Sequence, residues 1–271
     1  MNITIKRYIK TLEDFLEPEN IKSGSSLNPF SSKHLSPKLE VFPTELAQLS
    51  QILQFSYQNG LAVIPIGGGT QFNLGNDPKH ADIMVNLTKL DQVIDYEPDD
   101  LTITVQAGIT LAKLQQILSA NNQFLPFDPP RPDLATLGGT LATNTSGVYS
   151  WKRNYLRDFV IGMKVVEANG LITKSGGKVV KNVTGYDMTK IHIGGLGTLG
   201  IIAELSLKLI PVIKEKTVTV DFKEFTDCFN ACMAIFNSYI SPNSLIVISP
   251  IFQKFLNPRS SDIFRLAIRL G

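Results

Sequence analysis

The sequence contains very little cysteine, histidine and tryptophan: two, three and one residue, respectively, in 271. Two cysteines are too few for a disulfide framework, and they cannot supply the full set of thiolates that an iron–sulfur cluster needs. The three histidines, His34, His80 and His192, show no metal-ligand spacing. These shortages argue against a disulfide-rich secreted scaffold, an iron–sulfur protein and a histidine-ligated metal site.

The sequence also has little net charge and no long apolar run. Its formal charge is +2 at pH 7, which gives no electrostatic basis for binding nucleic acid or an anionic membrane. The longest apolar runs are strand-sized, far shorter than the about 20 residues that span a bilayer. The N-terminal stretch MNITIKRYIKTLEDF has acids early and lacks a signal-peptide core. The sequence therefore predicts a cytoplasmic protein without a transmembrane segment or a nucleic-acid partner.

The first part of the chain predicts mixed helices and strands after an N-terminal extension. Residues 1–38 are expected to hold a short helix that Thr11 caps, and then a serine-rich connector. The body starts at residue 39 with a helix that Thr44 caps and Gly60 ends. Its predicted inward residues are Leu46, Leu49, Leu53 and Tyr57. Buried strands are then expected at 61–66, 81–87 and 101–108, followed by a helix opened by Thr110 with Leu111, Leu114 and Leu118 inward.

The second half predicts antiparallel strands. Residues 158–176, DFVIGMKVVEANGLITKSG, read as two strands joined at Asn169-Gly170, a strong hairpin signal. Another alternating strand runs from Ile201 to Pro211. Residues 212–271 predict a smaller β-α-β-β unit, cut short after a last strand, FRLAIRL, whose apolar edge is expected to be unpaired.

Three glycine-rich segments lie between the predicted helices and strands. The first, PIGGGTQFNLG at 65–75, lacks the Gly-Lys-Ser/Thr of a Walker loop, but its glycines let backbone N–H groups approach an anion; a flexible turn is the alternative. The second, residues 128–147, combines small residues with short polar side chains and suits a flat polar cofactor. Its alternative is a small-residue helix packed closely on a sheet. The third, GGLGTLG at 194–200, contains the pattern GxGxxG.

The third segment does not fit a nicotinamide-binding Rossmann fold. In that fold a helix opens on the last glycine and its N-terminus holds the pyrophosphate. Here Gly200 is followed by IIAELSLKLIP, whose alternating pattern predicts a strand. The glycines are therefore expected to serve another nucleotide in another fold.

Together, the three segments resemble the FAD-binding domain of the vanillyl-alcohol oxidase and p-cresol methylhydroxylase superfamily. The stretches PIGGGTQ, RDFVIGMKVVEANG and GGKVVKNVTGYDMTKIHIGGLGTLGIIAELSLKL are similar to the FAD-binding subunits of bacterial and cyanobacterial glycolate oxidase. The resemblance covers residues 39–211. It implies an α+β fold: a two-subdomain FAD-binding domain of the p-cresol methylhydroxylase (PCMH) type, followed at 212–271 by the truncated start of an α+β cap domain.

The resemblance also implies which residues bind FAD. From the first segment these are Ile66, Gly67, Gly68, Gly69, Thr70 and Gln71, around the pyrophosphate. From the second they are Thr136, Gly138, Gly139, Ala142, Asn144, Ser146 and Gly147, along the pyrophosphate and ribityl chain. From the third they are Gly197, Thr198, Gly200, Ile201 and Ile202, near the adenine and the flavin. The first segment has no histidine to attach the flavin, so FAD is expected to be non-covalent. No catalytic residue is assigned.

The implied activity is oxidation of glycolate to glyoxylate by hydride transfer to flavin. The implied partners are other glycolate oxidase subunits, including a second flavin subunit and an iron–sulfur subunit, which could hold the chain at a membrane periphery. The alternatives are a self-sufficient FAD-linked dehydrogenase of the D-lactate type and a flavin-holding or assembly subunit without chemistry.

Five further residues admit two interpretations each. His192 is either a base near the flavin or a packing residue on a short helix. Cys228 and Cys232 are either a redox pair or part of an apolar helix face. Arg153 and Arg157 either attract an anionic substrate or lie in a solvated loop.

Overall fold

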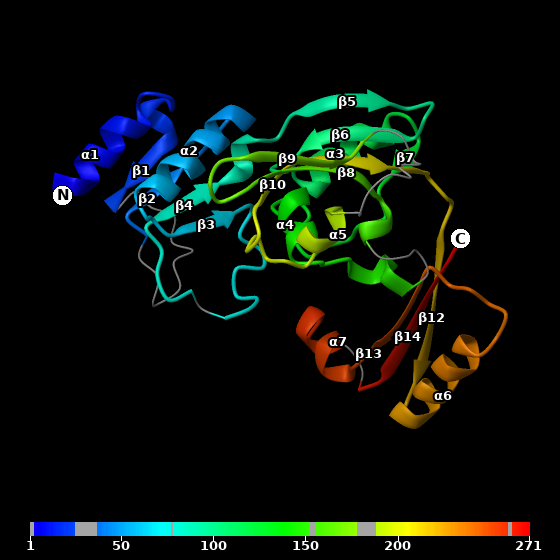
Figure 1. Ribbon diagram of the computed structural model, residues 1–271. Coiled ribbons are helices and arrows are strands. Elements are labelled where there is room, and N and C mark those ends of the chain that lie inside the picture. The colour runs from blue at the N-terminus through cyan, green and yellow to red at the C-terminus, as the bar shows by residue number, and fades with distance from the viewer. Residues whose placement is uncertain (1–2, 25–36, 77, 152–155, 178–187, 260–261) are drawn as a thin grey trace. The chain divides into compact units, whose positions relative to one another are not determined.

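The computed structural model describes residues 3–24, 37–76, 78–151, 156–177, 188–259 and 262–271 (Figure 1). The chain divides into two units. The first unit comprises Met1–Leu125, Pro129–Thr145 and Leu156–Ile210. The second unit comprises Pro126–Asp128, Ser146–Tyr155 and Pro211–Gly271.

The first unit begins with a small sheet of order β1-β2-β4-β3. Its strands are β1 Ile21–Ser23, β2 Leu39–Val41, β4 Ile83–Asn86 and β3 Val63–Ile66. Strands β2, β4 and β3 are parallel, and β1 is antiparallel to β2. The associated helices are α1 Ile3–Leu12, α2 Leu46–Gln58 and the short 3-10 helices η1 Pro18–Asn20 and η3 Leu87–Lys89.

A second, antiparallel sheet of order β5-β6-β10-β8-β9 completes the first unit (Figure 1). Its strands are β5 Val93–Glu97, β6 Thr102–Gln106, β10 Ile201–Lys208, β8 Val160–Val166 and β9 Ile172–Gly176. The remaining elements are α3 Leu111–Ser119, β7 Gln123–Phe124, α4 Leu137–Ala142, η5 Leu156–Asp158 and α5 Thr189–His192. Val166, Ile201 and Ala203 are buried with Leu49 and Ile83, so both sheets share one core.

The second unit is built on a three-stranded antiparallel sheet of order β12-β14-β13. Its elements are η4 Gly147–Trp151, β12 Lys216–Phe222, α6 Phe225–Phe236, β13 Ser244–Ile248, α7 Pro250–Leu256 and β14 Phe264–Leu270, and β11 Ile210–Pro211 lies at the junction of the units. The expectation that β14 has an unpaired edge is wrong, because β14 is the central strand. Helix α7 is an addition to the expected β-α-β-β order.

Two predictions about the N-terminal helices are wrong. No helix starts at Thr11, which lies in the last turn of α1; the helix ends at Leu12. The Thr11 hydroxyl donates to the carbonyl of Arg7, four residues earlier, as within a helix. Thr44 does not cap α2 either, since its N–H and hydroxyl both donate to the side chain of Gln48. Tyr57, expected inside, is 65% exposed because the buried face of α2 also uses Ile52 and Ser56.

The strand expected to be buried at 61–66 is half-buried, since β3 buries only Ile66. Several other local predictions in the described body are confirmed. Thr110 caps α3 by accepting the N–H of Lys113, and Leu111, Leu114 and Leu118 are buried. Gly60 follows α2 with a positive φ of 62°. Strands β8 and β9 form the hairpin around Asn169-Gly170. The serine-rich connector and the stretch KNVTGYD lie outside the described residues, apart from the connector's ends.

Candidate functional site

The three glycine segments meet in the first unit. A Cβ on Gly67 would clash with the Thr136 hydroxyl, so the first segment lies directly against the second. The second and third segments are joined by two hydrogen bonds, from Gly194 N–H to the Leu141 carbonyl and from Leu196 N–H to the Ala142 carbonyl, both 2.9 Å. A Cβ on Gly197 would lie 2.8 Å from Pro65 Cγ, which brings the third segment against the first.

The first segment presents a row of free backbone donors after β3. Within the described part of the chain, the N–H groups of Gly68, Gly69, Thr70 and Gln71 donate to no backbone carbonyl. Gly69 has a φ of 68°, the left-handed conformation that turns successive N–H groups toward one point. A cluster of such donors binds an anion such as a pyrophosphate. The first segment therefore fits the phosphates of a dinucleotide.

The second segment contains the small-residue helix α4, which the sequence left as the alternative to a cofactor surface. The N–H groups that open α4 are already used: Leu137 donates to Ile109, Gly138 to Ala107, and Gly139 to the Thr136 hydroxyl. Gly138 is buried, and a Cβ there would lie 2.7 Å from the Ala107 Cβ. Packing thus accounts for glycine at 138, whereas Gly139, Ala142 and Asn144 are partly open to solvent.

The third segment leads straight into β10, as expected for a fold other than Rossmann. Gly200 is buried, and a Cβ on it would lie 2.6 Å from Val165 Cγ1. Thr198 closes a turn, since its hydroxyl donates to the Gly195 carbonyl at 2.7 Å. Ile201 and Ile202 are each 4% exposed, so their side chains belong to the protein interior.

The structure does not bring all the proposed FAD-binding residues into one unit. Ser146 and Gly147 belong to the second unit, while the rest belong to the first. Sequence reasoning also missed the residues that the glycines approach: the Leu134 carbonyl, with which a Cβ on Gly68 would clash, and Pro65. No sequence signal identifies a backbone carbonyl from another segment as the reason for a glycine.

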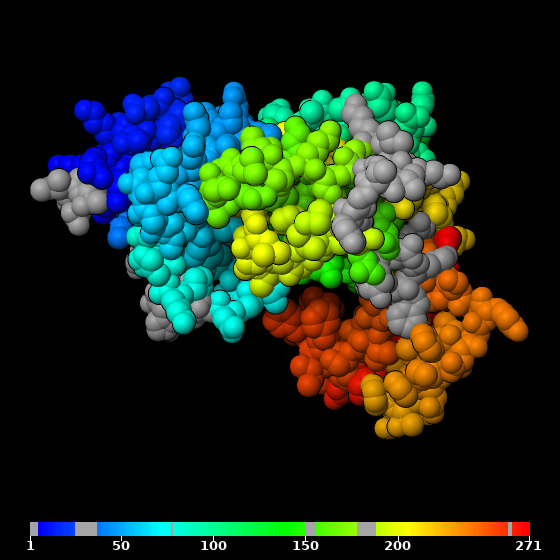
Figure 2. Space-filling model, in the orientation of Figure 1, coloured from blue at the N-terminus to red at the C-terminus, as the bar shows by residue number. Residues whose placement is uncertain are grey.

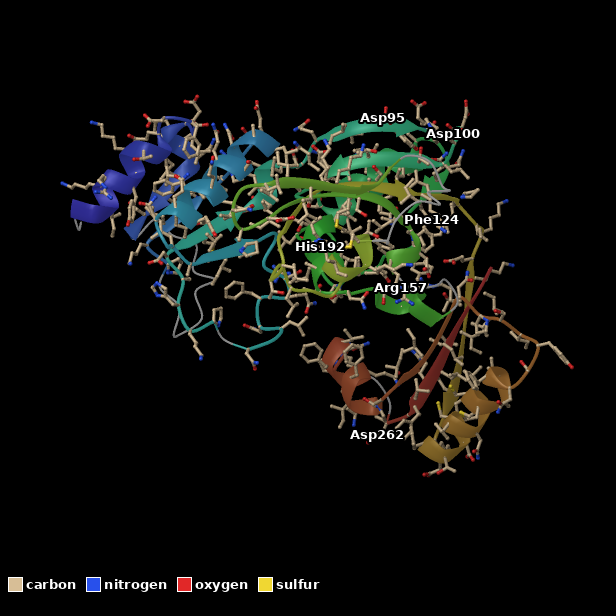
Figure 3. The ribbon with its side chains drawn as sticks, in the orientation of Figure 1. Asp95, Asp100, Phe124, Arg157, His192 and Asp262 are labelled. Atoms are coloured by element: carbon tan, nitrogen blue, oxygen red, sulfur yellow. The ribbon has the colours of Figure 1, made fainter. Side chains whose placement is uncertain are left out.

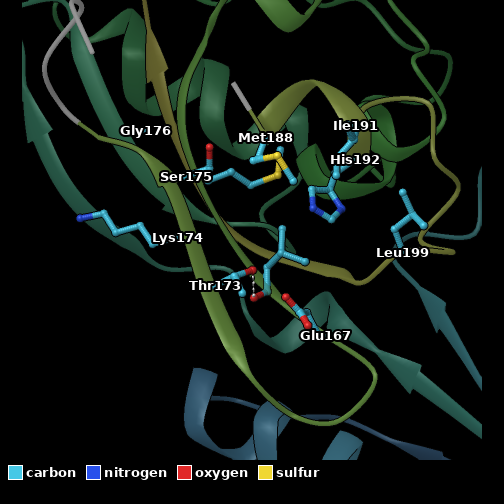
Figure 4. Close-up of a pocket in the computed structure, with 11 residues that line it drawn as sticks. Glu167, Thr173, Lys174, Ser175, Gly176, Met188, Ile191, His192 and Leu199 are labelled. Atoms are coloured by element: carbon cyan, nitrogen blue, oxygen red, sulfur yellow. Dashed lines mark hydrogen bonds between the residues drawn. The ribbon is translucent and has the colours of Figure 1, made fainter. Parts of the chain in front are cut away.

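A cavity of about 540 Å³ lies beside the third segment (Figure 4). His192 on α5 and Glu167 at the end of β8 face it together. Burial lowers the pKa of His192, and the Glu167 carboxylate opposes that shift, so the imidazole is mostly neutral at pH 7. The other lining residues are Met163, Val165, Thr173, Lys174, Ser175, Gly176, Met188, Ile191 and Leu199.

The remaining candidate residues do not assemble into a catalytic group among the described residues. His192 and Arg157 lie on separate elements, α5 and η5 (Figure 3). Arg153 lies outside the described residues. Cys228 and Cys232 are free thiols on α6; Cys228 is buried, and its burial, with the neighbouring Cys232, raises its pKa. That shift makes Cys228 less reactive and fits a core residue. None of the described helices is long and apolar enough to cross a bilayer.

The chain is similar in sequence to several enzymes named for 2-hydroxy acids. The glycolate oxidase subunit GlcD of Bacillus subtilis (strain 168) is 32% identical over 216 residues, which cover 78% of this chain and 46% of that protein. The D-lactate dehydrogenase of Anaerostipes hadrus is 30% identical, covering 86% and 51%. The D-2-hydroxyglutarate dehydrogenase of Stutzerimonas stutzeri (strain A1501) is 28% identical, covering 74% and 45%. The chain spans about half the length of these relatives.

Solved structures with low sequence identity share the fold. An alkyldihydroxyacetonephosphate synthase superposes with a TM-score of 0.79 at 20% identity, over 98% of this chain and 55% of that one. A p-cresol methylhydroxylase superposes with a TM-score of 0.78 at 16% identity, over 100% of this chain and 61% of that one. These matches confirm the expected α+β fold of the PCMH type.

The family itself is identified by residues 37–176, more than half of the chain, which match the family described as FAD binding domain. The match contains the first and second glycine segments, with the free N–H groups of Gly68–Gln71. The chain therefore belongs to the FAD binding domain family, and its cofactor is FAD.

Proposed function

We propose that this chain is the FAD-binding part of an oxidoreductase that acts on a small 2-hydroxy acid. The supporting observation is the convergence of three glycine segments beside the free N–H groups of Gly68–Gln71. Its relatives are named for glycolate, D-lactate and D-2-hydroxyglutarate, all of which are 2-hydroxy acids. The shared chemistry of those names is oxidation of a C–OH group beside a carboxylate.

In this proposal the chain's own residues bind and orient the cofactor. The N–H groups of Gly68, Gly69, Thr70 and Gln71 hold the pyrophosphate, and the absence of side chains at Gly67 and Gly68 lets the segment lie against Thr136 and Leu134. Bound FAD supplies the two-electron acceptor for the hydride that leaves the substrate's α-carbon. The hydroxyl group on the same carbon loses its proton to solvent water, and the product is the 2-oxo acid.

The finer proposal is a subunit of a glycolate oxidase complex that converts glycolate to glyoxylate. Electrons then pass to partners, a second flavin subunit and an iron–sulfur subunit, because Cys228 and Cys232 are the chain's only thiols. The complex is cytoplasmic and reaches a membrane only through those partners. A self-sufficient D-lactate-type dehydrogenase and a flavin-holding subunit without chemistry are the competing candidates.

The surface of the second unit supports contact with further polypeptide. Helices α6 and α7 expose large apolar side chains, among them Phe229 at 47%, Ile251 at 82% and Phe255 at 81%. In the space-filling view of Figure 2 the C-terminal part of this unit is drawn in orange to red, and α6 lies on the visible surface. Exposed apolar groups on this scale favour protein contacts. The polypeptide that corresponds to the unmatched half of the relatives is our proposed occupant.

Flavin content and anaerobic titration test the proposed function. The purified chain is expected to carry FAD that acid precipitation releases, and to bind no nicotinamide nucleotide with comparable affinity. Glycolate, D-lactate and D-2-hydroxyglutarate are then added anaerobically, with and without the partner subunits, while the visible flavin absorbance is followed. Loss of absorbance with one acid identifies the substrate, and a chain that holds no flavin contradicts the proposal.

A further inference from the structure

A half-buried polar cluster in the second unit ties Tyr149 to the three-stranded sheet. The Tyr149 hydroxyl donates to Glu215 Oε2 at 3.0 Å, and Asn243 Nδ2 donates to Glu215 Oε1 at 2.5 Å. The Arg269 guanidinium carbon lies 5.5 Å from the centroid of the Tyr149 ring. Asn243 is wholly buried, and its N–H donates to the Arg269 carbonyl at 2.7 Å. Both oxygens of one carboxylate are therefore used.

Packing alone does not explain why this cluster is made of polar side chains. Polar groups taken from water cost free energy unless each finds a partner, so apolar residues would serve packing equally well. Burial of Tyr149 and its bond to Glu215 raise the pKa of Tyr149, and Arg269 opposes that shift. The phenol therefore stays protonated and keeps donating to Glu215 across the physiological pH range.

Tyr149 stands at the end of the second glycine segment. It lies in η4, two residues beyond Gly147, which has a φ of 73° and on which a Cβ would clash with the Asp128 carbonyl. The Asp128 N–H donates to the Ser146 carbonyl at 3.2 Å. Residues 126–128 and 146–155 both belong to the second unit, whereas the intervening 129–145 belong to the first. The base of the second glycine segment, Asp128 with Ser146 and Gly147, is thus closed within the second unit.

We propose that Tyr149, through Glu215, Asn243 and Arg269, is a positioning residue that holds the base of the second glycine segment in the conformation that FAD binding needs. The inference rests on the proposed function. A binding segment whose ends are already fixed loses less conformational entropy when the ligand binds. Tyr149 therefore acts on the cofactor by preorganising Ser146 and Gly147, which lie in the same unit as the cluster.

Two matched tyrosine variants of the full chain test this role. Tyr149→Phe removes the hydroxyl that donates to Glu215, and Tyr96→Phe removes one that donates to Gln123 in the first unit, also at 3.0 Å. We expect Tyr149→Phe to raise the FAD dissociation constant about tenfold, equivalent to about 1.4 kcal/mol, with Tyr96→Phe within about twofold of the unchanged chain. The visible circular dichroism of the bound flavin is expected to change only in Tyr149→Phe.

Variants of Glu215 separate positioning from general stability. Glu215→Gln keeps an oxygen that accepts from Tyr149. Its new amide N–H faces the Asn243 side-chain amide and donates to Asn243 Oδ1, which has no partner among the described residues, once that amide turns over to exchange Nδ2 and Oδ1. Glu215→Gln is expected to retain near-normal FAD affinity, whereas Glu215→Leu is expected to match Tyr149→Phe. If Tyr149→Phe fails to fold, the FAD dissociation constants of Glu215→Gln and Glu215→Leu still test the positioning role. Equal dissociation constants for all the folded variants would overturn the positioning role alone, and a chain that never binds FAD would overturn it together with the proposed function.

Discussion

At the scale of single residues, we propose that Gly68 links packing to cofactor binding. A Cβ at this position would clash with the Leu134 carbonyl, and its N–H is one of the free donors of the first segment. Any side chain therefore moves the segment away from the second segment and misdirects the N–H groups of Gly69 and Thr70. The donors then no longer converge on one anion.

Gly68→Ala is expected to weaken FAD binding at least about tenfold and to destabilise the fold by about 1–3 kcal/mol. Gly177→Ala is the matched control, because a Cβ on Gly177 meets no atom of the described residues within 4 Å. The measurement is flavin bound per folded molecule. If the first segment were a mere turn, Gly68→Ala would lose stability but keep normal flavin occupancy in its folded fraction.

Asp82 makes the stability of the first unit depend on pH. Its carboxylate accepts hydrogen bonds from Lys38 Nζ at 2.7 Å and from the Ala62 N–H at 3.0 Å. A carboxylate oxygen also lies 2.8 Å from His80 Nε2. Burial raises the pKa of Asp82, but these partners outweigh it and hold the pKa below its ordinary value of 3.8. Because the folded pKa is depressed, the stabilisation is present at neutral pH and is lost as the pH falls through the folded pKa.

Asp82→Asn is therefore expected to lower the free energy of unfolding by about 1–3 kcal/mol at pH 7. The difference from the unchanged chain should shrink as the pH falls below about 4, where the unfolded carboxyl takes up its proton. Denaturant unfolding at several pH values measures it. Asp100→Asn, which replaces the carboxylate of an exposed residue in the same way, is the control variant. A constant difference down to acid pH would contradict the electrostatic role.

The residue scale also shows a limit of sequence reasoning. Runs of glycine and threonine mark the three segments, and the structure brings them together. The reason for each glycine is visible only in three dimensions, since Gly138 meets Ala107 and Gly200 meets Val165, both remote in sequence. A sequence pattern does not distinguish a glycine that approaches a cofactor from one that approaches a neighbouring strand.

At the scale of elements, local signals predicted most strands and helix α3, but misplaced the N-terminal helix. Thr11 has the residue type of an N-cap, yet Ile5, Tyr8, Ile9 and Leu12 already form an apolar helical face that packs into the core. Burial of that face outweighs the local preference of threonine for a cap. Leu16, which follows α1, is also in the core.

Helix α4 provides a prediction for a single capping group. Thr136 is 2% exposed, and its hydroxyl accepts the Gly139 N–H at 3.3 Å beside Gly67. Thr136→Val keeps the shape and removes that acceptor, at an expected cost of about 1 kcal/mol. Thr110→Val, which uncaps α3 in the same way, is the matched control. Thermal unfolding should show a similar loss of stability in both variants, and only Thr136→Val should weaken FAD binding. An equal loss of FAD affinity in both variants would count against a site at Gly67 and Thr136.

At the scale of the whole molecule, the order of most elements could be predicted but their pairing could not. The alternating stretches of residues 212–271 indicate strands, whereas the central place of β14 depends on contacts with β12, about fifty residues earlier in the chain. The same non-local pairing makes β10 the centre of the large sheet, between β6 and β8. The FAD-binding fold was predicted from the resemblance of the motifs to a known family. The resemblance implies the strand pairing of that family but gives no physical reason for it.

The last prediction concerns turnover by this chain alone. Dehydrogenation requires that the substrate's carboxylate be held and its α-hydrogen be aimed at the flavin, which demands a well-oriented binding site. Among the described residues no group of catalytic side chains is assembled, and the second unit exposes apolar side chains such as Ile251 and Phe255 that a partner would cover. We therefore expect the isolated chain to bind FAD but not to be reduced by glycolate at a useful rate, and partner subunits to restore reduction. Anaerobic rapid mixing with glycolate measures the rate, and dithionite serves as the control that the bound flavin is reducible. Rapid bleaching by glycolate with this chain alone would show that the site is complete without a partner, and would favour the self-sufficient dehydrogenase.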